Sequence, residues 1–168
     1  FAHQSVGNDI LAGVREIAPR LAIVRGETPR TAPAIIETLI GRNGDPIGKI
    51  DHFAALMQSM GDRVDVAMFK FCYVDFTAAS DVEAIGRHYR DTLTRLKAAY
   101  PKTRFVHVTV PLTIVQRGPK AFVKQLLGRP RWGERENQRR AQFNGWLRRT
   151  FRAMGTEVVA LASATAGL

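Results

Sequence analysis

The sequence predicts an α/β domain with a mainly parallel sheet, because short apolar strand patterns alternate along the chain with amphipathic helical patterns. The alternation is clearest in the middle of the chain. An apolar run over 64–75 is typical of a buried strand, a helical pattern then runs from Val82 to just before Pro101, and a second strand pattern covers 104–110. A length of 168 residues suits one core, so we expect a single domain over 1–168.

The first part of the chain is predicted to hold a helix and a short strand. Asn8 or Asp9 can cap a helix over about 9–18. The apolar run 21–24 predicts a strand, and the segment 41–49 is a loop dense in turn residues.

Four further signals complete the predicted order of elements. Apolar residues at helical spacing predict a helix over 50–60, and Ser80 and Glu83 form a capping box at the start of the following helix. The apolar stripe over 134–154 predicts a long helix, and the run 157–162 predicts the last strand.

The positive charge is concentrated in one part of the chain. Between Thr113 and Ala153 there are eleven Lys or Arg and two Glu, so this part carries +9 of the net +10. Within it, the irregular basic stretch 116–133 is expected to be an insertion or lid. The aromatic residues are spaced as core and not as an exposed stacking ladder, so we expect no nucleic-acid partner.

The cysteine count, the lack of long apolar runs and the lack of cofactor motifs restrict the range of possible functions. Cys72 is the single cysteine, which excludes an internal disulfide and a cysteine zinc site. No apolar run approaches the roughly 18 residues of a membrane span, and no nucleotide or metal motif is present, so we expect no cofactor. The chain opens on Phe1 without a signal pattern, which indicates a fragment or a processed chain whose first, central strand lies upstream, and this end does not indicate a compartment.

A polar turn at the start of the chain is the first candidate for chemistry. Ser5 follows His3 and precedes Gly7 and Asn8, immediately before the first helical pattern. Serine hydrolases of α/β build place their nucleophile between a strand end and a helix start, where helix N–H groups face the developing negative charge. The alternative is an ordinary polar turn that caps a helix.

Taken with four later motifs, this turn resembles the SGNH/GDSL hydrolases, and within them a bacterial branch whose nucleophile turn reads His-Gln-Ser-Val-Gly. The similar motifs cover 41–46, 70–75, 100–101 and 108–113. The resemblance implies a flavodoxin-like three-layer α/β/α fold and the activity of an esterase, lipase or carbohydrate deacetylase. It also implies that Ser5 is the nucleophile.

The same resemblance implies an oxyanion hole, for which Gly44 is the expected donor and Asn43 an alternative. The family asparagine of the third loop is missing at Cys72–Asp75, and Asn8 could replace it from the nucleophile turn, with Gly7 beside it. Asn144 matches an asparagine often seen before the last strand, or is a polar residue at a helix edge.

The general base is the open question, because the family's Asp-x-x-His segment is absent from 160–166. A serine needs an adjacent base. His3 is a candidate, whereas His107 fits a core position in its strand. Asp75 could orient either histidine or form an ion pair with Lys70.

Two functions follow from these observations. The chain is expected to be a serine hydrolase that cleaves an ester, such as an acylated carbohydrate, with the basic lid favouring anionic substrates. The alternative is a catalytically inactive module of the same fold that binds a carbohydrate or an acidic polymer.

Overall fold

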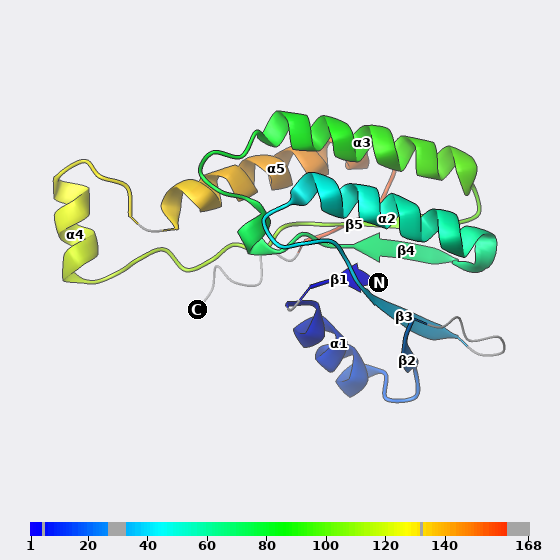
Figure 1. The fold of residues 1–168 in the computed structure, drawn as a ribbon. Coiled ribbons are helices and arrows are strands. Elements are labelled where there is room, and N and C mark those ends of the chain that lie inside the picture. Colours follow the sequence, from blue (N-terminus) through cyan, green and yellow to red (C-terminus); the bar gives the residue numbers. More distant parts are fainter. Residues whose placement is uncertain (5, 27–32, 132, 161–168) are drawn as a thin grey trace.

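The computed structural model describes residues 1–4, 6–26, 33–131 and 133–160. In this part of the chain, six parallel strands form one sheet in the order β2-β3-β1-β4-β5-β6 (Figure 1). The strands are β1 (Ala2–His3), β2 (Ala22–Arg25), β3 (Ala34–Leu39), β4 (Val66–Phe69), β5 (Arg104–Val108) and β6 (Val158–Val159).

Helices cover both faces of the sheet. Helix α1 (Val6–Ile17) lies on one face, and α2 (Pro46–Met60), α3 (Val82–Ala99) and α5 (Glu134–Ala153) lie on the other (Figure 1). This arrangement confirms the predicted flavodoxin-like three-layer α/β/α fold. The central strand that we expected upstream of the chain is represented by β1, whose Ala2 pairs with β3 on one side and β4 on the other.

Two strand predictions need correction. Strand β3 was not predicted, because Glu37 and Thr38 interrupt its apolar run; pairing with β1 and β2 on its two sides makes it a strand. The predicted strand over 64–75 is limited to β4. Beyond Lys70 the chain leaves the sheet and forms a short 3₁₀ turn at Tyr73–Asp75.

Two helix starts also differ from the prediction. Helix α1 begins at Val6, so Asn8 and Asp9 lie in its first turn and are not its cap. Helix α3 is capped by Asp81, whose carboxylate accepts hydrogen bonds from Glu83 N and Ala84 N. Ser80 lies one residue too early for that role, and its hydroxyl accepts from Thr77 N instead, at 2.8 Å.

The core is an aromatic layer between the sheet and helices α2, α3 and α5. Phe69 lies 4.8 Å from Phe53 of α2, and Phe71 lies 5.3 Å from Phe143 of α5, measured between ring centroids. Tyr89 of α3 contacts both Phe69 and Phe71. This layer fixes the end of β4 and therefore the loop that follows it.

The predicted basic insertion contains regular structure. Within 116–133 the chain forms α4 (Pro119–Leu126), with a proline in its first turn, where its missing N–H costs no hydrogen bond. Strand β6 covers Val158–Val159 of the predicted 157–162, and residues 161–162 of that run lie outside the described residues. None of the helices in the described ranges is long and apolar enough to cross a membrane.

Candidate active site

The candidate site lies at the carboxyl ends of β1, β3 and β4. Strand β1 lies between β3 and β4, so the chain crosses from one side of β1 to the other on its way from β3 to β4. Open parallel sheets bind ligands at such a switch point, outside the carboxyl ends of the strands. Three predicted segments meet here: the turn after His3, the loop 41–46 and Asp75.

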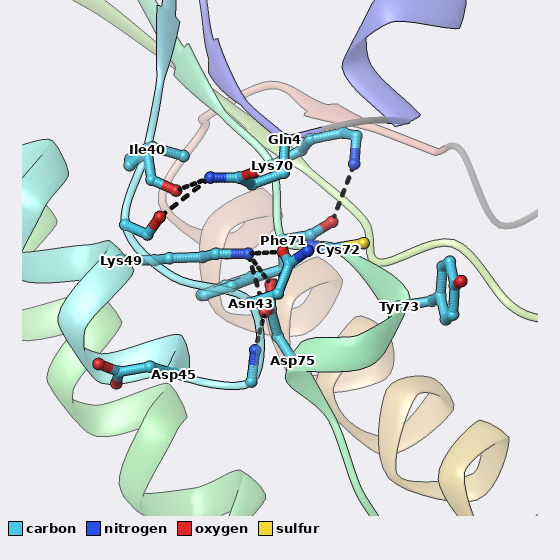
Figure 2. A network of polar contacts seen from close by, with 12 residues as sticks. Gln4, Ile40, Asn43, Asp45, Lys49, Lys70, Phe71, Cys72, Tyr73 and Asp75 are labelled. Carbon is cyan, nitrogen blue, oxygen red and sulfur yellow. Dashed lines mark hydrogen bonds and ion pairs between the residues drawn. The ribbon is translucent and has the colours of Figure 1, made fainter.

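The residues on either side of the proposed nucleophile make hydrogen bonds to the rest of the site. Ser5 itself lies outside the described residues, but its neighbours are described. Gly7 N donates a hydrogen bond to Gln4 O at 2.7 Å. The Gln4 side-chain amide donates to Ile40 O at 2.7 Å and to Gly41 O at 2.9 Å, which ties the turn to the end of β3 (Figure 2).

His3 is completely buried beneath the start of α1. The contact is so close that a Cβ at Gly7 would lie 2.0 Å from the His3 ring, so this helix position requires glycine. The ring Nδ1 lies 2.8 Å from Gln4 O, and Nε2 lies 3.2 Å from Glu37 Oε1. Asp75 was one suggested partner for His3. The carboxylate that orients His3 is instead Glu37.

Glu37 is buried and ionised. Burial raises its pKa, but the hydrogen bond and charge of Arg25, together with the charge of His3, outweigh burial and hold the pKa below its usual value. Sheet register explains why Arg25 and His3 both contact Glu37. Arg25 pairs with Glu37 itself, and His3 pairs with Leu39, two residues further along β3. Sequence reasoning missed Glu37, although an acid inside the apolar run 34–39 was a usable signal.

Asp75 belongs to a different network. Its two carboxylate oxygens accept from Lys49 Nζ at 2.8 and 2.7 Å, from Gly44 N at 2.9 Å and from Cys72 N at 2.6 Å. Figure 2 shows Lys49 reaching this carboxylate from α2, with Asn43 Oδ1 also accepting from its ammonium at 2.9 Å. The ion pair that we suggested with Lys70 is thus made with Lys49.

These contacts change the expected oxyanion hole. The N–H of Gly44 donates to a carboxylate, and the Asn43 oxygen accepts from an ammonium, so both residues brace the loop. Asn144 is buried and uses its side-chain oxygen and nitrogen on Val110 N and O, at 2.7 and 2.9 Å. Asn8 is exposed in the first turn of α1.

Lys70 is a second buried ionisable side chain at this edge, on the same face as His3. Its backbone N–H donates to Ala2 O at 3.2 Å, which places it beside β1. Phe69 and Phe71 on either side face the aromatic layer, so the Lys70 side chain faces α1. Burial lowers its pKa, and its ammonium donates to Phe71 O at 3.2 Å (Figure 2).

Of the remaining histidines, His52 accepts a hydrogen bond from Gly41 N on its Nδ1 at 2.8 Å and so supports the loop 41–46, whereas His107 and His88 lie outside this network. His107 confirms its predicted core position, since its ring stacks on Phe151 at 3.7 Å and its Nδ1 lies 2.8 Å from the Tyr89 hydroxyl. Burial lowers the pKa of His107 to about 4. His88 pairs with Asp51 on the surface.

No metal site is visible among the residues that the structure describes, because no three His, Cys, Asp or Glu side chains gather there as a ligand set. An apolar cavity of about 440 Å³ lies at the opposite, amino ends of β1, β3 and β4. Its lining includes Leu11, Ile36 and Met57 and excludes His3 and Glu37. It is therefore separate from the candidate site.

No family model matches the chain, and no curated protein matches it.

Proposed function

We propose that this chain is a serine hydrolase that cleaves an ester through an acyl-enzyme on Ser5. The observation that carries the proposal is the buried His3–Glu37 pair at the switch point of the sheet, in which His3 precedes Ser5 by two residues in the sequence. A carboxylate that orients an imidazole beside a serine is the arrangement that activates hydrolytic nucleophiles.

In the proposed reaction, Ser5 Oγ forms a bond to the ester carbonyl carbon while its proton passes to His3 Nδ1. The C–O bond to the alcohol then breaks, and His3 returns the proton to the leaving oxygen. Water repeats the sequence to release the acid. Glu37 holds Nε2 and stabilises the imidazolium, and Nδ1 must exchange the Gln4 carbonyl for the serine hydroxyl.

The negative charge on the substrate oxygen would face the start of α1. The first N–H groups of a helix have no partner within the helix, and the helix dipole favours negative charge at this end. The N–H of Gly44 and the side chain of Asn144 are engaged elsewhere, and the N–H of Gly7 donates to Gln4 O, so the other first N–H groups of α1 are the better source of donors. An acylated carbohydrate remains our proposed substrate class.

A second candidate function is a non-catalytic module that binds a carbohydrate or an acidic polymer. The observation that favours it is the full engagement of His3, whose two ring nitrogens both face oxygen atoms inside the protein. A ring held in this way would be purely structural.

Fluorophosphonate labelling, read by peptide mass spectrometry, distinguishes the two functions. We expect an adduct on Ser5 in the native protein, none in Ser5→Ala, and full labelling in the control Ser59→Ala, which removes an exposed serine of α2. His3→Gln and Lys70→Met then identify the base, because we expect only the first to suppress labelling. A folded protein without an adduct on Ser5 would exclude the hydrolase and favour the binding module.

A further inference from the structure

Helix α4 stands away from the sheet at one end of the molecule and carries an unusual surface (Figure 1). Four large apolar side chains here are exposed: Phe122, Val123 and Leu126 in the helix and Leu127 at its C-cap. The exposed fractions of Phe122 and Leu126 are 67% and 77%. Since a buried residue, Ala121, defines the inner side of the helix, these four form its outer face.

The spacing of the four residues shows that they form one stripe. At 100° per residue, positions 122, 123, 126 and 127 fall within one side of a helix. A single exposed apolar residue is ordinary on a protein surface, but a contiguous apolar stripe marks an interaction site. The stripe therefore needs a partner that can cover it.

The charge around the stripe identifies the chemistry of that partner. The segment 116–131 contains five Lys or Arg and no Asp or Glu. Arg117, Lys120 and Arg129 are exposed, and in the described ranges no carboxylate pairs with any of them. A short helix with an apolar face and basic flanks is the pattern of helices that lie in the interface of an anionic membrane.

We propose that α4 and its basic flanks bind the surface of a membrane that contains anionic lipids, with the stripe inserted among the headgroups. A second copy of the chain is a poorer occupant, because pairing two such faces would bring two clusters of positive charge together. A nucleic acid would use the charge but not the aliphatic side chains, and one phenylalanine makes no stacking ladder.

Co-sedimentation of the whole protein with lipid vesicles tests this proposal. We expect binding to phosphatidylglycerol vesicles at low salt, weaker binding at high salt, and little binding to phosphatidylcholine vesicles, since anionic headgroups attract the basic flanks. Replacing Phe122 and Leu126 together by serine should weaken binding at least about tenfold, because two inserted apolar side chains are lost.

The matched control is Ile17→Ser, which removes an 84% exposed apolar residue at the end of α1 and should leave vesicle binding unchanged. Both variants change exposed side chains, so circular dichroism should report the native fold. Equal vesicle binding by the α4 double variant and the parent protein would overturn the proposal. Failure of the parent protein to bind phosphatidylglycerol vesicles would overturn it as well. A dimer that depends on the stripe, without vesicle binding, would assign the surface to a second copy.

Discussion

Two buried histidines lie on opposite faces of the same sheet, and their surroundings are opposite in character. His3 lies beneath α1 beside an ionised carboxylate, which is itself held by Arg25. His107 lies against an aromatic ring and a tyrosine hydroxyl, with burial lowering its pKa to about 4. Burial alone therefore does not distinguish the proposed base, His3, from the core residue His107.

The two faces of the sheet differ in the side chains that surround each histidine. The face toward α2, α3 and α5 is an aromatic layer, which favours the neutral imidazole. The face toward α1 carries ionisable side chains on neighbouring strands, where Arg25 and His3 both contact the Glu37 carboxylate and Lys70 lies beside β1. We infer that chemistry belongs to the α1 face and stability to the aromatic face.

The largest expected effect tests the carboxylate on the α1 face. Glu37→Gln keeps the size of the side chain but removes the charge that orients His3, so the rate of fluorophosphonate labelling at Ser5 should fall about 10²- to 10⁴-fold. Asp51→Asn is the matched control, because it alters the exposed Asp51–His88 pair and should leave the rate unchanged. An unchanged rate in Glu37→Gln would remove the functional distinction between the two faces.

The second prediction applies the same comparison to two buried lysines. Lys49→Met leaves the buried Asp75 carboxylate without its cationic partner. It should lower the free energy of unfolding by about 3–5 kcal/mol in urea titrations. Lys70→Met removes an ammonium whose described partner is a carbonyl, so its cost should be clearly smaller. Equal losses in the two variants would show that Lys70 also serves as a structural charge.

The smallest effect concerns pH and the aromatic face. The pKa of His107 is about 4 in the folded protein against 6.5 in an unfolded chain, so the unfolded state binds more protons between these values. Stability should therefore fall by up to about 3 kcal/mol as the pH drops from 6.5 to 4. His107→Gln, which can still accept from Tyr89, should weaken this dependence in urea titrations at several pH values. An identical pH dependence of the unfolding free energy in the variant would show that a group other than His107 causes it.

The sequence by itself determined the fold class and most of the elements. Local periodicity was sufficient for helices such as α5, predicted over 134–154 and found at Glu134–Ala153, because an apolar stripe reports which side of a helix will be buried. It also predicted where polar loops gather, because parallel strands bring their carboxyl ends to one edge. The turn before α1, the loop 41–46 and Asp75 do meet at the switch point.

Only the tertiary structure decided which polar groups are partners. His3 meets Glu37 across 34 residues, and Asp75 meets Lys49 across 26, because strand order and the placement of α2 bring these segments together. Strand β3 depended on the same long-range pairing, since its own sequence is interrupted by polar residues. Local patterns carry no information about such distant contacts, so the carboxylate beside the candidate base became visible only in the folded chain.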